Sequence, residues 1–411
     1  MGDKERCLQI LNGGGFGLER ESLRVDSEGR LAQTSHPFPG CPDIDRDFCE
    51  NQVEIVTPVA DSVDAVYDMI GNYHRKVVTG LKCLASGPEY LWPFSNPPYI
   101  SGTDEIPIAQ FTGELEERTR YRNYLCERYG KVKMTFSGIH FNYSYPEIFI
   151  ESEMKRIGSG DKAEFTDHLY LELAKKLTEY SWLIVMLTSA SPVNDRSFWE
   201  LSEKRVCQDD TYASIRSSED GYWNEFTPVL AYKNIRAYVD SINTYVESGS
   251  FISSKELYYP VRLKPRGDYS MEALKEKGVS HIEIRSIDLN PLAEYRIEKH
   301  DLKFIQKLIA WLTVAPESEF SENDQIAAIS NMKKAAHIDL ENIYISVNGE
   351  EKNILEQGRR ILKEMLDMFP DDEDVLFQLD KINDPEKRYA NIIKEKYSDD
   401  YTAKGLELAK R

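Results

Sequence analysis

Four segments of this chain alternate polar and apolar residues with a period of two, and their polar positions carry carboxylates, imidazoles and amides. Successive residues of a β-strand point to opposite faces of a sheet. Each segment is therefore predicted to be a strand with one apolar face and one face of potential ligands. The segments span residues 18–25, 50–58, 137–145 and 281–289. Their polar faces hold Glu19 and Glu21, then Glu50, Gln52 and Glu54, then His140 and Asn142, and finally His281, Glu283 and Arg285.

If these strands are neighbours in one sheet, their carboxylates converge. Close carboxylates cannot all stay ionised without a compensating cation. Oxygen ligands with an occasional imidazole suit Mg²⁺ or Mn²⁺, which keep coordination positions open for phosphates. The pattern therefore predicts a carboxylate-lined bowl that holds divalent metal. The spacing leaves one alternative open, in which these polar residues are solvent-facing positions of ordinary amphipathic strands. The absence of Lys from the four faces argues against this alternative.

The charge balance excludes several classes of partner. The 411 residues include 51 Lys and Arg and 70 Asp and Glu, for a formal net charge of −19. This charge would repel nucleic acid and anionic membranes, so neither is an expected partner. The longest strongly apolar run, residues 182–187, is far shorter than the roughly 20 residues that cross a bilayer, and the N-terminus shows no secretory signal.

The cysteines and histidines add little to the predicted chemistry. The six cysteines have no CxxC spacing, which indicates reduced thiols in a cytoplasm. Cys49 lies beside acidic residues that raise a thiol pKa, so a nucleophilic role is not expected. The other cysteines are Cys7, Cys41, Cys83, Cys126 and Cys207. His140 is the exception among the histidines. A structural role is expected for His36, His74, His168, His300 and His337.

The chain changes character near residue 315. Normal alternation of polar and apolar segments predicts one catalytic domain over residues 1–315, with helices beginning at Val63 and covering 165–188. Residues 316–411 are charged and helix-forming, and they are predicted to be a helical appendage packed on that domain. Its clearest helices are expected at 354–368 and 390–410, with the acidic residues 371–374 in an exposed loop between them.

Seven blocks carry a resemblance to a known family. In order along the chain they are GLERESLRV, DFCENQVEIVTP, LWPFSNPPYI, YRNYLCERYG, SGIHFNYS, ELYYPVR and HIEIRSIDLNP, and together they cover most of residues 15–300. The chain resembles bacterial glutamate–cysteine ligase, as in the N-terminal part of bifunctional glutathione synthases. The resemblance implies an α+β fold with a glutamine-synthetase-like curved antiparallel sheet, whose polar concave face binds Mg²⁺ with helices behind.

The resemblance also implies the reaction and its residues. ATP would phosphorylate the γ-carboxylate of L-glutamate, and the L-cysteine amine would attack the acyl phosphate to give γ-glutamylcysteine, the first step of glutathione biosynthesis. Arg285 would stabilise the transferring phosphoryl group, and Glu54 or Asp47 would accept the amine proton. The implied metal ligands are Glu19, Glu21, Asp47, Glu54, His140 and Glu283. The implied substrate residues are Tyr121, Arg122, Arg216, Tyr222, Gln52 and Asn142, and the nucleotide residues are Tyr258, Arg262 and Lys264.

Several alternatives stay open. Arg122 follows Glu114 and Arg118 at helical spacing, as in a solvated ion-pair row, and Tyr258 could be a core aromatic. The enzyme could use another amine acceptor, or the protein could be a non-catalytic amino-acid-binding relative. Residues 205–255 and the tail match the family poorly. Because the chain ends at residue 411, no ATP-grasp domain is expected, and a separate glutathione synthetase would carry out the second step.

Overall fold

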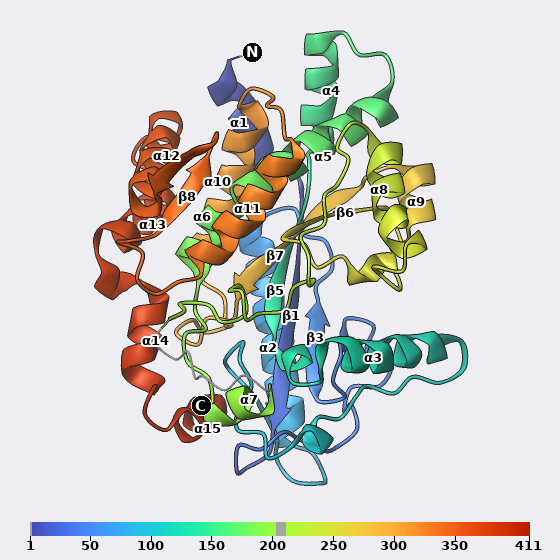
Figure 1. The fold of residues 1–411 in the computed structure, drawn as a ribbon, viewed down its shortest axis with the longest axis vertical. Coiled ribbons are helices and arrows are strands. Elements are labelled where there is room, and N and C mark those ends of the chain that lie inside the picture. Colours follow the sequence, from blue (N-terminus) through green and yellow to red (C-terminus); the bar gives the residue numbers. More distant parts are fainter. Residues whose placement is uncertain (1, 203–210) are drawn as a thin grey trace.

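The computed structural model describes residues 2–202 and 211–411, and the predicted thiol Cys207 lies outside these ranges. Within them, an open antiparallel sheet runs through the middle of the molecule, with helices packed around it (Figure 1). The sheet order is β2-β3-β1-β5-β7-β6, and β4 pairs with the end of β1. The strands are β1 (Gly15–Val25), β2 (Ile44–Arg46), β3 (Gln52–Val56), β4 (Tyr90–Leu91), β5 (Gly138–Ser144), β6 (Val261–Lys264) and β7 (His281–Asp288). This mixture of helices and antiparallel sheet confirms the predicted fold class.

The strand register places the predicted polar faces on one side of the sheet. Glu19 of β1 pairs with His140 of β5, and Glu21 of β1 pairs with Glu54 of β3. Directly paired residues of antiparallel neighbours project to the same face. The β5–β7 register shifts between Ile139 and Phe141, and such a bulge re-aims the side chain at that point, here His140. The four polar faces are therefore parts of one surface.

One detail of the predicted faces is wrong, and one residue of the polar face lies outside them. Glu50 precedes β3 and lies in a turn, where its Oε2 accepts a hydrogen bond from Arg46 Nε at 2.8 Å. Lys264 does lie on the polar face, because β6 pairs with β7 and places Lys264 opposite His281. The four alternating segments did not include β6, so Lys264, which the resemblance implied for the nucleotide, was not expected on this face.

The other face of the sheet is apolar and carries the main core. Leu18, Phe141 and Ile284 are at most 1% exposed and pack in one cluster with residues of α5 and α10. The α-helices are α1 (Asp3–Leu11), α2 (Val63–Lys82), α3 (Glu116–Tyr129), α4 (Glu147–Ile157), α5 (Lys162–Glu179), α6 (Ser181–Thr188), α7 (Arg196–Leu201), α8 (Ile235–Glu247), α9 (Met271–Lys277), α10 (Lys299–Val314), α11 (Glu322–Ala335), α12 (Ile354–Met368), α13 (Glu373–Asn383), α14 (Tyr389–Tyr397) and α15 (Tyr401–Lys410). None of these helices is long and apolar enough to cross a membrane.

The predicted helices lie where they were expected, but two of the predicted segments are each divided into two helices. The segment 165–188 forms two helices, α5 and α6, and 390–410 forms α14 and α15. Asp400 separates the latter pair with a positive φ of 58°, a conformation that ends a helix. A hairpin of β8 (Tyr344–Val347) and β9 (Glu350–Asn353) precedes α12.

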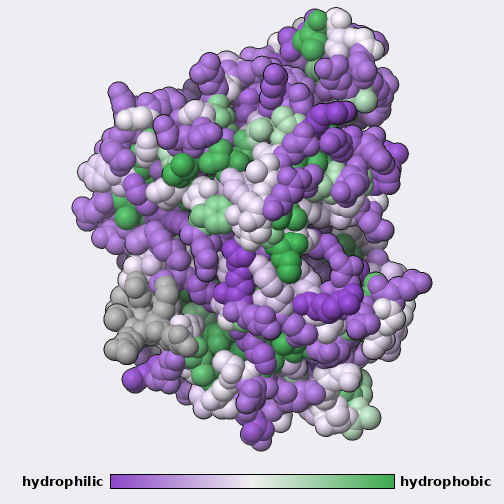
Figure 2. Space-filling model, turned by 45° about the vertical axis from the view of Figure 1, so that its right-hand side comes forward, coloured by the Kyte–Doolittle hydropathy of each residue, from purple (hydrophilic) through white to green (hydrophobic). Residues whose placement is uncertain are grey.

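Hydrophilic residues cover most of the face in Figure 2, where hydrophobic residues form small patches near the middle.

The acidic segment 371–374 is not an exposed loop. Asp372 caps the N-terminus of α13 by accepting backbone N–H groups of Asp374 and Val375. Asp374 is 2% exposed and pairs with Lys307 and His300 of α10. Carboxylates that satisfy a helix N-terminus and neutralise a neighbouring lysine can be buried. This contact ties the C-terminal helices to the body, and the division of the chain at residue 315 stays a prediction.

Lys381 of α13 offers a test of how much the contacts of the C-terminal helices contribute to the free energy of unfolding. Its ammonium is buried, 3.0 Å from Asp301 Oδ1 of α10, and donates to the Leu187 carbonyl at 2.6 Å. Lys381→Met is expected to lower the free energy of unfolding by about 3–5 kcal/mol, because Asp301 keeps a buried charge without its cation. Urea denaturation measures the loss. The exposed Lys387→Met is the matched control and should change little; equal effects of the two variants would contradict the expectation.

Candidate active site

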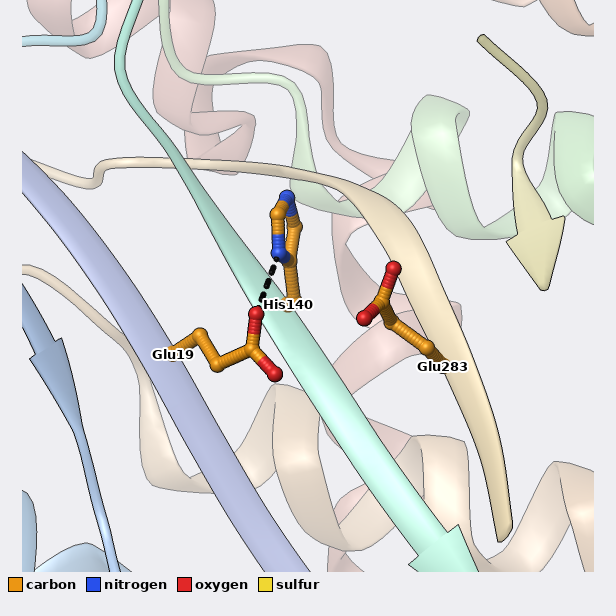
Figure 3. Close-up of side chains that lie close together, drawn as sticks. All are labelled: Glu19, His140 and Glu283. Carbon is orange, nitrogen blue, oxygen red and sulfur yellow. Dashed lines mark hydrogen bonds and ion pairs between the residues drawn. The ribbon is translucent and has the colours of Figure 1, made fainter. Parts of the chain in front are cut away.

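Three predicted metal ligands meet on adjacent strands. Glu19, His140 and Glu283 project toward one another from β1, β5 and β7 (Figure 3). One potential ligand atom from each lies within 4.8 Å of the others, and His140 Nδ1 is 2.9 Å from Glu19 Oε2. Asn142 donates to Glu19 Oε1 at 2.9 Å, while its own Oδ1 is buried without a partner. The strands thus bring two carboxylates, an imidazole and an unsatisfied amide oxygen to one place.

Glu283 is the most enclosed member of this group. It is fully buried, and it pairs with Arg285 on the same strand and with Lys264 Nζ of β6 at 2.6 Å. Burial alone would raise the pKa of Glu283, but the Lys264 and Arg285 charges outweigh burial and hold this pKa well below its usual range. The carboxylate is therefore ionised and fixes two cations beside the metal-ligand group.

A second group of carboxylates continues along the same face. Glu21 and Glu54 are direct partners across β1 and β3. Burial, followed by the charge of Asp47, raises the pKa of Glu21 to about 8. Burial and the charges of Asp47, Glu19 and Glu21 also raise the pKa of Glu54. These carboxylates carry more negative charge than the neighbouring cationic side chains compensate. Such an excess is typical of a site that binds a cation.

The raised pKa of Glu21 predicts an unusual pH dependence. Between its ordinary value of 4.5 and about 8, Glu21 keeps its proton in the folded state and loses it in the unfolded chain. The metal-free protein should therefore lose stability as the pH rises through this window, by up to about 1.4 kcal/mol per pH unit for this group. Urea unfolding at several pH values in a chelator measures the slope, and Mg²⁺ should reduce it. An unchanged slope in Glu21→Gln would contradict the assignment.

Arg216 reaches this carboxylate group from the loop that precedes α8. Its Nη2 donates to the Arg285 carbonyl at 2.8 Å, and its Nη1 lies 3.9 Å from Asp288 Oδ1. The guanidinium passes directly over Gly138, where a Cβ atom would collide with it. The Gly138 N–H in turn donates to Glu21 Oε2 at 2.9 Å. Sequence reasoning missed Gly138, whose only signal was a small residue at the start of a polar-faced strand.

An aromatic cluster borders the bowl. The ring centroids of Tyr222 and Tyr258 are 4.0 Å apart, and burial raises the pKa of Tyr121, which lies beside Tyr258, to about 12. Burial raises the pKa of Tyr222, and Asp47 and Arg285 are among the charges that act on it. Tyr258, predicted for the nucleotide, thus lies with Tyr121 and Tyr222, which were predicted for the amino-acid substrate.

Three other predicted residues bind the main chain around the bowl. Gln52 donates to the Phe136 carbonyl at 2.9 Å. Arg122 donates to the Asp47 carbonyl at 2.7 Å and lies over the Phe111 ring, so it does not form the Glu114 ion-pair row. Arg262 donates to the carbonyls of Lys255 and Leu257. These contacts fix the surrounding loops, and the predicted substrate or nucleotide roles of the three residues stay predictions.

Cys49 has no catalytic character in this setting. The residue is fully buried, and burial followed by the Asp47 charge raises the pKa of its thiol. A thiol with a raised pKa is a poor nucleophile at neutral pH. The prediction that Cys49 is not a nucleophile agrees with this environment. The described residues Cys7, Cys41, Cys49, Cys83 and Cys126 are free thiols.

A family model described as glutamate–cysteine ligase matches residues 3–252 and 227–335. The chain belongs to the glutamate–cysteine ligase family. The glutathione biosynthesis bifunctional protein GshAB of Listeria monocytogenes serotype 4b is 35% identical over 412 residues, which are 95% of this chain and 53% of the relative. The corresponding protein of Clostridium perfringens is 34% identical over 426 residues, 96% of this chain and 53% of its own length. This chain therefore spans about half the length of the curated family relatives it matches.

Two solved structures share the fold. The bifunctional glutathione synthetase of Pasteurella multocida matches with a TM-score of 0.83 at 26% identity, over 99% of this chain and 53% of the other. The glutamate–cysteine ligase of Francisella tularensis, solved in complex with AMP, matches with a TM-score of 0.85 at 21% identity, over 97% of this chain and 88% of the other. Membership of the glutamate–cysteine ligase family agrees with the resemblance of the seven sequence blocks.

Proposed function

We propose that this protein joins the γ-carboxylate of L-glutamate to the amine of L-cysteine, using ATP and Mg²⁺ and passing through γ-glutamyl phosphate. The observation that carries the proposal is the convergence of Glu19, His140 and Glu283 from three adjacent strands, with Arg285 beside them. Family membership and the names of the bifunctional glutathione relatives support the same reaction.

The donor set fits a divalent cation. Glu19, His140 and Glu283 would hold one ion, and Glu21, Asp47 and Glu54 would surround a second. The buried, unpartnered Asn142 Oδ1 and the raised pKa values of Glu21 and Glu54 support this fit, because a cation would satisfy both. Oxygen ligands suit Mg²⁺ or Mn²⁺. A bound ion would supply charge neutralisation for the nucleotide phosphates, which an acidic bowl otherwise repels.

The chain's own residues account for the rest of the chemistry. Glu283 fixes Arg285 and Lys264, whose positive charges would stabilise the phosphoryl group during transfer. Glu54 or Asp47, once ionised, would accept a proton from the attacking amine. The cluster of Tyr121, Tyr222 and Tyr258 would form an apolar wall beside the amino acids, and Arg216 would pair with an α-carboxylate.

The test is a turnover assay with a panel of amines. Purified protein with ATP, Mg²⁺ and L-glutamate should release ADP and phosphate with L-cysteine, and mass spectrometry should detect γ-glutamylcysteine. Faster turnover with a non-thiol amine would show that this amine, and not cysteine, is the acceptor. The panel is needed because one small group on the amine changes selectivity by only about 1–3 kcal/mol. ATP binding without ADP release would contradict the enzymatic proposal.

The second step of glutathione synthesis is proposed to need a separate glutathione synthetase. The matched relatives are named as bifunctional, and this chain corresponds to about half of their length. Supplying a purified glutathione synthetase to the reaction should convert γ-glutamylcysteine to glutathione. The cytoplasmic location stays a prediction.

A further inference from the structure

A second group of potential metal ligands lies away from the bowl. His168 and Glu172 are one turn apart on α5, so they share a face of that helix. Glu317, from the connection between α10 and α11, lies over them, with its Oε1 3.1 Å from His168 Nε2. One potential ligand atom from each of the three residues lies within 4.8 Å of the others. His168 was expected to be structural, and the sequence could not show this group because Glu317 is distant from His168 in the chain.

Glu172 is the enclosed member of this group, and one of its carboxylate oxygens makes no hydrogen bond. The residue is 9% exposed, and its Oε2 is buried without a hydrogen bond. Its Oε1 pairs with Lys175. A buried carboxylate oxygen without a partner carries a desolvation cost that a bound cation would offset. The exposed side chains of His168 and Glu317 lie beside this enclosed carboxylate and can adjust to a shared ion.

The neighbouring cations do not fill this position. Lys175 pairs with the other Glu172 oxygen and lies 3.4 Å from the Ser318 carbonyl. Lys176 is used elsewhere, because it donates to the carbonyls of Leu312 and Ala315 at 2.9 and 2.6 Å. The charge of Lys176 still acts on Glu172 and Glu317 from that position, and Lys175 is the cation that pairs directly with Glu172.

We propose that His168, Glu172 and Glu317 bind Zn²⁺, with solvent at the fourth position. Zn²⁺ accepts imidazole and carboxylate ligands, and three protein ligands leave its fourth position for solvent. The bound metal would fasten the α10–α11 connection to α5, which packs on the apolar face of the sheet. The role of the metal would thus be structural, and the site lies apart from the carboxylate bowl.

Zinc binding to the whole protein tests the proposal. The bowl offers zinc the same donors, one imidazole and two carboxylates, so titration calorimetry compares wild type with His168→Ala and with His140→Ala. The binding event that is kept in His140→Ala and lost in His168→Ala is the one tested. Wild-type protein should bind zinc with a rise in Tm, and His168→Ala should weaken binding at least about tenfold and abolish the rise. His168→Ala should still fold, since this side chain is 45% exposed. The matched control His337→Ala removes a histidine whose carboxylate neighbour, Glu219, is 3.7 Å away, and it should leave binding unchanged.

Lys175→Met separates a metal site from a plain surface ion pair. Removing the cation that competes for Glu172 should tighten zinc binding several-fold if Glu172 is a ligand. Zinc affinity equal in wild type and His168→Ala, or unchanged in Lys175→Met, would overturn the proposal. Ligase turnover with Mg²⁺ should be the same in wild type and His168→Ala, so failure of the zinc site and failure of the proposed reaction are distinguishable.

Discussion

Glu283→Gln is expected to lower kcat/KM for the ligation by about 10³-fold. The substitution removes one of the three ligand groups that meet in the bowl. It also leaves Lys264 and Arg285 without the carboxylate that fixes them. Both effects act on the charge that develops during phosphoryl transfer, so the loss should appear mainly in kcat. Steady-state kinetics with varied Mg²⁺ and ATP measure it.

The same variant should also be less stable. Glutamine fills the space of glutamate, so no cavity forms, but two partly buried cations, Lys264 and Arg285, lose their buried counter-charge, and the free energy of unfolding should fall by up to about 3 kcal/mol. Circular dichroism at the assay temperature confirms the folded fraction before rates are compared. Glu276→Gln on the exposed side of α9 is the matched control, because it makes the same charge change away from the bowl. Activity of folded Glu283→Gln within a few-fold of wild type would place the reaction elsewhere.

Gly138→Ala is expected to lower kcat/KM by about 10²-fold, although alanine is the smallest possible change. The new methyl group would occupy the space of the Arg216 guanidinium. Arg216 would then lose its hydrogen bond to the Arg285 carbonyl and its place near Glu21. A small displacement of a positioned group is enough for a loss of this size. Overpacking should cost about 1–3 kcal/mol of stability.

Two further variants identify the cause. Gly160→Ala introduces the same methyl group where no atom lies within 4 Å, so it should be neutral. Arg216→Ala removes the group that collides, so Gly138→Ala should destabilise the Arg216→Ala background much less than the wild type. Activity should stay low in the double variant, because the guanidinium is gone. Equal stability losses in the two backgrounds would show that Gly138 acts independently of Arg216.

Local pattern was enough to find most of the bowl. Glu19, Glu21 and Glu54 were placed on ligand faces because side chains alternate along any strand, whatever its neighbours. The pattern misplaced Glu50, which continues the alternation but lies in a turn. It gave no sign of Lys264, whose strand has only four residues, so this residue was named from the family blocks alone.

Sequence by itself determined which side chains share a strand face, and the family blocks determined the family. Tertiary structure alone decided which strands are neighbours, that Arg216 crosses Gly138, and that Glu317 meets His168. The physical reason is range: periodicity is a property of a few consecutive residues, whereas these contacts join segments far apart in the chain. Only packing of the whole chain fixes such contacts, together with the burial and charge that shift the pKa of Glu21 and Glu283 in opposite directions.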